Sequence, residues 1–199
     1  MARSGSRQRL SPDQRRADII LAVERVLAGR DPSSVTFEEI AAEAGVSRAL
    51  VYNYFGDRGG LLAAVYNAAF ADLDRELDLA LLQGLTAQAR VEQVVQRYVA
   101  FARSHAGNWR SLRTLAGAQL PAVQRARDDR YDRLASRWGG GDEARVVVAG
   151  LLGLLEAVVL DWMSRPTVET ARLVELLEDL TWSGLQGLVQ DGVVSVGAA

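Results

Sequence analysis

Residues 36–61 read TFEEIAAEAGVSRALVYNYFGDRGGL, and the interpretation of the whole chain starts from this stretch. It holds two short helical patterns separated by Gly45, with an aromatic cluster near its end. Thr36 and Glu39 have the spacing of a capping box, so a helix is expected to begin there and to end at Gly45. Ser47 is expected to cap the second helix. Two short helices joined by a tight turn are typical of a helix-turn-helix.

The second of these helices has one face suited to a small core and other faces suited to DNA. Val51 and Phe55 lie four residues apart, so they share a face and are expected to pack on the first helix. Tyr52 and Asn53 are left on exposed faces. An asparagine can pair with adenine and an arginine with guanine, and a helix N-terminus offers N–H groups to a phosphate. In such a motif the second helix enters the major groove.

The pattern T-x-x-E-I-A-x-x-A-G-V-S-R-x-x-x-Y-x-Y-F-x-x-R-x-x-L in this stretch resembles the DNA-binding module of the TetR family of bacterial transcriptional regulators. The resemblance covers roughly residues 12–75. It implies an omega-shaped homodimer in which three N-terminal helices bind DNA and a larger helical domain binds a small molecule and dimerises. By position, it implies base contacts from Arg48, Ala49, Leu50 and Asn53 and phosphate contacts from Thr36, Ser47, Tyr52, Tyr54 and Arg58.

One departure from the family pattern concerns the start of the following helix. Gly59-Gly60 stands where the family often has a charged pair, and this is expected to weaken the first turn of that helix. The helix is nevertheless expected to run from Asp57 to about Leu82, because apolar residues recur along it at helical spacing.

The composition indicates a globular protein and excludes several kinds of site. The chain has 199 residues, of which 49% are hydrophobic and 24% charged. It has no cysteine and one histidine, so disulfides, thiolate metal sites and a cysteine nucleophile are excluded, and no metal or cofactor is expected. The net charge is −2, but residues 1–16 hold five arginines and a single aspartate, which marks a basic arm. The N-terminus lacks the apolar segment of a secretory signal, so a cytoplasmic location is expected.

Helical periodicity continues to the C-terminus without an alternating strand pattern. The predicted fold is therefore all-α with around nine helices, including a short one near Leu112 and Leu115. The domains are expected to be a flexible arm (1–10), a three-helix helix-turn-helix DNA-binding domain (11–56) and a helical ligand-binding and dimerisation domain (57–199). Alternating arginines and aspartates over 125–133 indicate a solvated helix face.

The last two long helical patterns, 142–164 and 168–190, suit a two-fold interface. The first is apolar nearly all round, and its ten unbroken apolar residues (146–155) are too few for a membrane helix, which needs about 20. Small residues would let a partner helix approach closely. Burial within one subunit is the alternative. The candidate interface residues are Ala149, Gly150, Gly153, Ala157, Leu173, Leu177 and Leu180.

A ligand pocket is expected among aromatic and aliphatic residues of the C-terminal domain, although ordinary core packing also explains each of them. The candidates are Tyr98, Phe101, His105, Trp109, Leu112, Leu115, Trp138 and Met163. Because these side chains are mostly apolar, a ligand is expected to be largely apolar as well.

Three classes of function follow from these patterns. The first is a repressor that binds a palindromic double-stranded DNA operator as a homodimer and is released by a small apolar ligand. The second is a DNA-binding regulator without small-molecule control, governed by a protein partner or acting as an activator. The third, a helical-bundle enzyme, is disfavoured because the sequence has no E-x-x-H, phosphate loop or nucleophile elbow.

Overall fold

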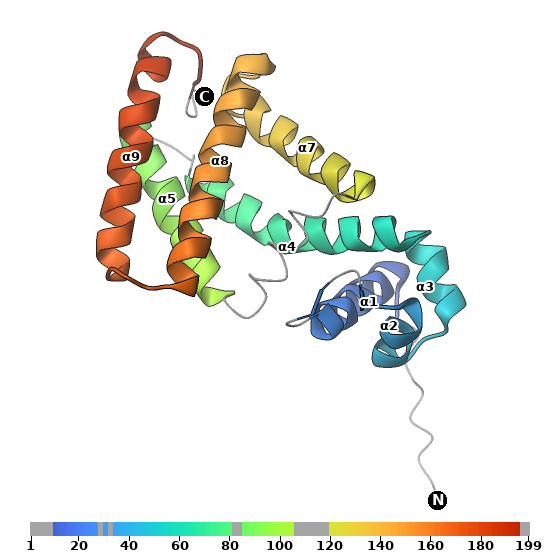
Figure 1. Cartoon of the computed structure of the whole chain (residues 1–199). Coiled ribbons are helices and arrows are strands. Elements are labelled where there is room, and N and C mark those ends of the chain that lie inside the picture. The colour runs from blue at the N-terminus through green and yellow to red at the C-terminus, as the bar shows by residue number, and fades with distance from the viewer. Residues whose placement is uncertain (1–9, 28–29, 32–33, 81–84, 106–119, 196–199) are drawn as a thin grey trace, which may run out of the picture.

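The computed structural model describes residues 10–27, 30–31, 34–80, 85–105 and 120–195, and within these ranges it is helical without any strand. This confirms the all-α prediction, while the expected helix near Leu112 and Leu115 lies outside the described residues. The helices are α1 (Pro12–Leu27), α2 (Phe37–Ala44), α3 (Arg48–Phe55), α4 (Arg58–Ala80), α5 (Ala87–Ser104), α7 (Pro121–Ser136), α8 (Gly141–Ser164) and α9 (Thr170–Gln190) (Figure 1).

The helices form two bodies that share α4. Helices α1, α2 and α3 gather near the N-terminal end of α4, and α4 then runs into a larger body built from α5, α7, α8 and α9 (Figure 1). Within that body α4 packs on α5 and α7, α5 packs on α9, and α7 packs on α8. Helix α4 is therefore the element through which the small body is joined to the large one.

Local capping sets several helix boundaries, as the sequence indicated. The Gln14 N–H donates to Ser11 Oγ at 3.1 Å, and the Ser11 N–H donates to the Gln14 side chain at 2.9 Å, so a capping box opens α1. The tight corner between α7 and α8 consists of three consecutive glycines with φ of 108°, 74° and 84°. Only glycine adopts such backbone angles readily, and this explains the Gly139–Gly141 triplet.

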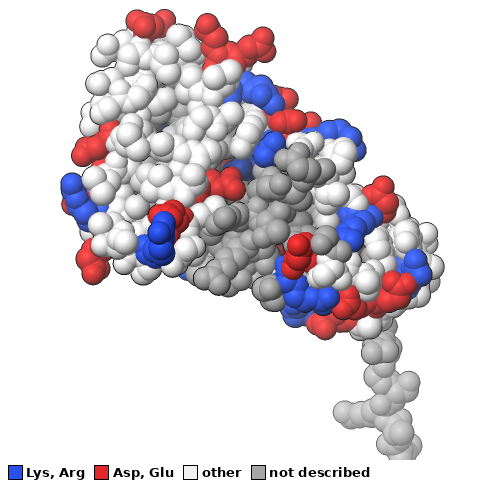
Figure 2. All heavy atoms as spheres, viewed as in Figure 1, with Lys and Arg blue, Asp and Glu red and all other residues white. Residues whose placement is uncertain are grey.

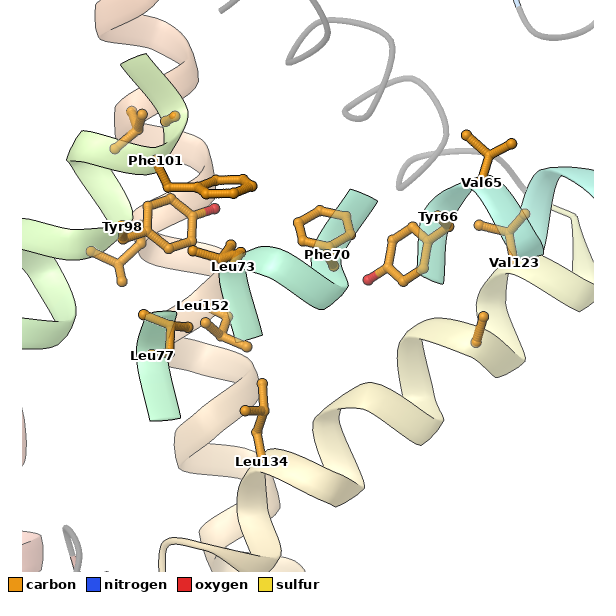
Figure 3. Close-up of a cluster of buried hydrophobic side chains, with 14 of the residues drawn as sticks. Val65, Tyr66, Phe70, Leu73, Leu77, Tyr98, Phe101, Val123, Leu134 and Leu152 are labelled. Atoms are coloured by element: carbon orange, nitrogen blue, oxygen red, sulfur yellow. The ribbon is translucent and has the colours of Figure 1, made fainter. Parts of the chain in front are cut away.

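Buried side chains of α5, α7 and α8 meet those of α4 in the core of the large body. Tyr66, Phe70, Leu73 and Leu77 project from α4 toward residues of α5, α7 and α8 (Figure 3). The same helix also buries Leu61, Leu62 and Val65, so it supplies core residues along most of its length. A displacement of α4 would consequently disturb packing in both bodies.

One ion pair inside this core was not expected from the charge pattern of α7. Arg130 is only 4% exposed, its Nε donates to Asp74 at 2.7 Å, and its guanidinium lies 4.4 Å from the centre of the Phe70 ring. Burial raises the pKa of the neighbouring Tyr66 hydroxyl to about 12. The prediction of a solvated face over 125–133 is therefore wrong for Arg130, which joins α7 to α4.

Candidate DNA-binding surface

The α2–α3 pair has a reciprocal cap at the start of α2, a left-handed glycine at its end and a single side-chain cap at the start of α3. Thr36 Oγ1 accepts from the Glu39 N–H at 3.2 Å, while the Glu39 carboxylate accepts from the Thr36 N–H at 2.9 Å. Gly45 ends α2 in the left-handed region, with φ of 63°. Ser47 then caps α3 by accepting from the Leu50 N–H at 3.2 Å. These contacts confirm the predicted boundaries of both helices.

The two faces of α3 separate as the spacing predicted. Val51 and Phe55 are buried, as are Ile40 and Ala41 of α2, the helix on which α3 packs. The outward residues divide by exposure: Arg48, Ala49, Tyr52 and Asn53 are exposed, whereas Leu50 and Tyr54 are half-buried. Four of these six are predicted base contacts, so the candidate base-reading residues share one accessible surface except for the partly covered Leu50.

Arg48 and Tyr52 form a preorganised unit, a detail that the sequence did not reveal. The Arg48 guanidinium donates to the Tyr52 hydroxyl at 3.2 Å and forms an ion pair with Glu38 of α2. The Tyr52 ring stacks on Phe37 with the ring centres 4.3 Å apart and the planes 10° from parallel. Phe37 and Glu38 therefore position two of the predicted DNA contacts. No sequence signal pointed to them, because they lie on the other helix.

The predicted phosphate contacts differ in the hydrogen-bonding groups that remain available. The Ser47 hydroxyl accepts a cap bond and keeps its own proton to donate. The Thr36 hydroxyl, by contrast, also donates to the Glu39 carboxylate at 3.0 Å, so its donor is engaged. Tyr54 and Arg58 are half-buried near the C-terminal end of α3. Of these four residues, Ser47 is the best placed to donate to a phosphate.

All three acidic residues of α2 pair with arginines from other segments. Glu43 bonds Arg25 of α1 at 2.6 Å, Glu39 bonds Arg30 at 3.0 Å, and Glu38 pairs with Arg48. Acidic and basic side chains are accordingly interspersed over this body (Figure 2). Because exposed pairs contribute little stability, their main consequence is to set side-chain positions and to neutralise local charge.

The Gly59-Gly60 pair, which was expected to weaken the next helix, lies at a close contact that requires glycine at position 60. Asp57 caps α4 by accepting from the Gly60 N–H at 2.7 Å. A Cβ at Gly60 would lie 2.2 Å from the Phe55 carbonyl oxygen, and one at Gly59 would lie 3.2 Å from the Ala122 Cβ. Glycine thus permits α4 to start directly beneath α3 and against α7.

A cavity of about 520 Å³ lies where α1, α4 and the end of α5 meet. Phe101 and His105, two of the predicted ligand contacts, line it. The His105 ring stacks on the Phe101 ring at 4.0 Å between centres, and its Nδ1 lies 2.9 Å from the Phe101 carbonyl oxygen, to which it donates. The volume is within the range of small-molecule sites.

The other predicted ligand contacts do not line this cavity. Tyr98 is buried at the α4–α5 contact, Trp138 borders a void of about 20 Å³, and Met163 is half-buried near the end of α8. Trp109, Leu112 and Leu115 lie outside the described residues. Conversely, the sequence gave no reason to assign residues of α1 to a ligand site, although α1 forms one wall.

The predicted dimer residues divide into exposed and buried groups. Gly150, Gly153 and Ala157 are exposed on one side of α8, and Ala149 is half-buried beside them. On α9, Leu180 is 53% exposed. The structure corrects the other two candidates, Leu173 and Leu177, which are 4% and 1% exposed because they face the interior of the same chain.

Further residues extend the exposed apolar face. Val146 is 69% exposed and Leu176 is 42% exposed, and a Cβ added at Gly184 or Gly187 would meet nothing within 4 Å. By length and composition alone α8 would be apolar enough to cross a membrane, and only 33% of its most apolar window is buried inside the chain. We call the exposed side of α8 and α9 the α8–α9 face; its members are Val146, Gly150, Gly153, Ala157, Leu176, Leu180, Gly184 and Gly187.

The described residues contain no cluster of histidine and acidic side chains able to hold a metal ion.

Known proteins similar to this chain in sequence are transcriptional regulators. Residues 19–65 match the family model of bacterial regulatory proteins of the tetR family. The BetI regulator of Brucella abortus is 36% identical over 81 residues, which cover 41% of this chain and 41% of that regulator. The transcriptional activator FasR of Mycolicibacterium smegmatis is 25% identical over 188 residues, covering 89% of this chain and 85% of FasR.

Solved structures extend the similarity to the whole fold. A putative transcriptional regulator from Pseudomonas aeruginosa matches with a TM-score of 0.71 and 24% identity, covering 90% of this chain and 93% of that one. The FadR regulator of Bacillus subtilis, solved in complex with stearoyl-CoA, matches with a TM-score of 0.60 and 17% identity over 84% of this chain and 98% of FadR. At these identities the matches establish the fold alone.

Proposed function

This chain belongs to the TetR family of bacterial transcriptional regulators, and we propose that it is a homodimeric repressor released from a palindromic operator by a largely apolar small molecule. It is a DNA-binding regulator rather than an enzyme. The proposal places it in the cytoplasm, where its operator is accessible. FasR, a relative, is a transcriptional activator, so activation is the alternative to repression.

The observation that carries the proposal is the exposed surface of α3. Arg48 and Asn53 present the two side-chain types that read guanine and adenine in the major groove, and Ala49 beside them leaves room for a base edge. Ser47 at the helix N-terminus keeps a donor for phosphate. We assign Arg48, Ala49 and Asn53 to bases, and Ser47 and Tyr52 to the backbone.

Dimerisation is supported by the α8–α9 face. Large apolar side chains there are exposed, and the space beside its glycines, where an added Cβ would meet nothing within 4 Å, would admit a second helix pair at short distance. A two-fold arrangement of such faces buries each against its copy. The two α3 helices would then enter successive major grooves about 34 Å apart, which requires a roughly palindromic site.

Ligand control is supported by the position of the cavity. Its walls come from α1 in the small body and from α4 and α5 in the large one, so an occupant contacts both. FadR, a structural neighbour, was solved with stearoyl-CoA, a ligand with a long apolar chain. A molecule that binds the two bodies in a spacing unfit for DNA needs a preference of about 1–3 kcal/mol to release the operator.

The proposal is tested by fluorescence anisotropy with the full chain and DNA flanking its own gene. We expect one fragment to bind at least about a thousandfold more tightly than random DNA, with affinity falling steeply as salt rises. Sedimentation should give a dimer at micromolar concentration. Equal affinity for all fragments, or a monomer that still binds its site tightly, would contradict the proposal.

A further inference from the structure

We infer that the cavity between α1, α4 and α5 binds an organic cation with an apolar body. This deepens the proposed ligand response by naming the class of ligand, and it relies on that proposal only for the consequence for DNA. The inference rests on three properties of the cavity: its apolar floor, its charge balance, and its position across the two bodies.

The floor of the cavity is apolar and small in side-chain volume. Ala68 and Ala69 of α4 leave space that larger residues would fill, and Phe101 provides an aromatic ring. Leu21 of α1 also lines the cavity and is 51% exposed. A ligand with an apolar body would cover it. The floor residues are Ala17, Ile20, Leu21, Leu27, Val65, Ala68, Ala69 and Phe101.

The charges around the cavity favour a positive ligand. Asp13, Glu24 and Asp72 line it together with one guanidinium, Arg16. Arg16 lies over the Phe55 ring at 5.4 Å, so an aromatic face already contacts it. Among the lining residues that the structure describes, the acidic groups therefore outnumber the arginines, which disfavours an anionic head group.

Glu24 is the carboxylate best placed to bind a cation. Asp72 is shared with Arg75 at 2.8 Å, but Glu24 has no hydrogen-bond or ion-pair partner in the part of the chain that the structure describes. It is half-buried, and burial raises its pKa, although His105 and Arg25 oppose this from a distance. A cation seated against Glu24 would compensate the desolvation of its charge.

The position of the cavity links occupancy to the recognition helices. Seven of its lining residues belong to α1, which packs on both α2 and α4. An occupant between α1 and α4 would alter the angle at which the small body meets α4. The site thus differs from the buried interior of the large body, where Tyr98 lies, because it needs no opening of that core.

The test compares three probes that share a decyl chain and differ in head group: decyltrimethylammonium, decanol and decanoate. Isothermal titration calorimetry with the full chain should show the cation binding about tenfold more tightly than the alcohol, with decanoate the weakest. Glu24→Gln should remove most of that preference. Asp18→Asn is the matched control, because it deletes an exposed α1 carboxylate that does not line the cavity.

A second variant keeps the inference testable if Glu24→Gln does not fold correctly. Ala17→Leu enlarges an exposed lining residue and should weaken the binding of all three probes while the unfolding temperature stays unchanged. Decanoate binding most tightly, or a cation preference that survives Glu24→Gln, would overturn the inference. Operator affinity without any probe is measured for every variant. If operator affinity is specific and unchanged while the probes do not show the expected preferences, only the ligand inference is wrong and the proposed DNA-binding function is unaffected.

Discussion

The α2–α3 pair and the α8–α9 pair are held in place by different forces. Helices α2 and α3 have 8 residues each, and a side chain caps the start of both. Helices α8 and α9 have 24 and 21 residues, and neither start has a side-chain cap. Short helices are marginal by themselves, so they depend on local bonds, whereas long ones are stabilised by burying an apolar face.

The outward surfaces of the two helix pairs also differ, in this case in polarity. The exposed side of α3 is mostly polar and its side chains already have partners within the chain, as Arg48 does in Glu38 and Tyr52. The exposed side of α8 and α9 carries exposed apolar side chains, and a Cβ added at its glycines would meet nothing within 4 Å. The first surface offers polar groups to a polar molecule, while the second is apolar, which is why we propose that a second subunit covers it.

The largest effect is expected from a charge on the α8–α9 face. Gly153→Asp should raise the dimer dissociation constant at least about a hundredfold, because an unpaired buried carboxylate costs several kcal/mol. Sedimentation velocity over a concentration series measures this. Ala100→Asp, which places the same charge on an exposed position of α5, should leave the dimer intact. Equal behaviour of the two variants would remove this face from the interface.

The next effect concerns the junction of α3 and α4. Gly60→Ala should lower the free energy of unfolding by about 2–3 kcal/mol, because the new Cβ would lie 2.2 Å from the Phe55 carbonyl oxygen and backbone must move. Gly59→Ala meets its neighbours at 3.2 Å and should cost much less. Urea unfolding of both variants checks the difference, and a stable Gly60→Ala protein would refute the packing argument.

Base reading by α3 is tested with Asn53→Ala. It should weaken operator binding by about 1–3 kcal/mol and relax the preference at one base pair, because the side chain is exposed and is proposed to read an adenine edge. Tyr52→Phe should instead weaken binding to all DNA sequences by a similar factor, since phosphates carry no direct sequence information. Anisotropy titrations on operator and random DNA separate the two. Equal losses on both DNAs for Asn53→Ala would exclude it from base reading.

Local caps should matter for the short helices and not for the long ones. Thr36→Ala removes the capping box of α2 and should lower the free energy of unfolding by about 1 kcal/mol. Glu169→Ala at the start of α9 removes a side chain that makes no cap bond, so its effect should be close to zero. Thermal or urea unfolding gives both values. Similar losses of unfolding free energy in the two variants would contradict the difference between the α2–α3 and α8–α9 pairs.

The smallest effect is expected from Glu38→Gln. Loss of the ion pair would free the Arg48 guanidinium to sample other rotamers, so the ratio of operator to random-DNA affinity should fall about two- to fivefold. Glu43→Gln removes an equal charge from α2 but releases Arg25 of α1, so it should not change this ratio. An unchanged ratio in Glu38→Gln would show that Glu38 does not position Arg48.

The sequence could predict the helix-turn-helix because its signals are local. The spacing of Thr36 and Glu39, the left-handed glycine at 45 and the four-residue interval from Val51 to Phe55 each specify geometry over one or two turns, and the structure has all of them. The contacts that side chains make between different helices have no comparable local pattern in the sequence. Phe37 and Glu38, which hold Tyr52 and Arg48, looked like ordinary first-turn residues of α2.

The sequence by itself therefore determined that the chain is helical, where most helices begin, and which face of α3 is free to meet DNA, because capping and periodicity act within a few residues. Only the tertiary structure decided that Arg130 is buried against Asp74, that Leu173 and Leu177 face inward while Leu180 faces outward, and that α1 forms one wall of a cavity. These features depend on how distant helices rotate and pack against one another, and a helical repeat specifies an apolar side without specifying which neighbour will cover it.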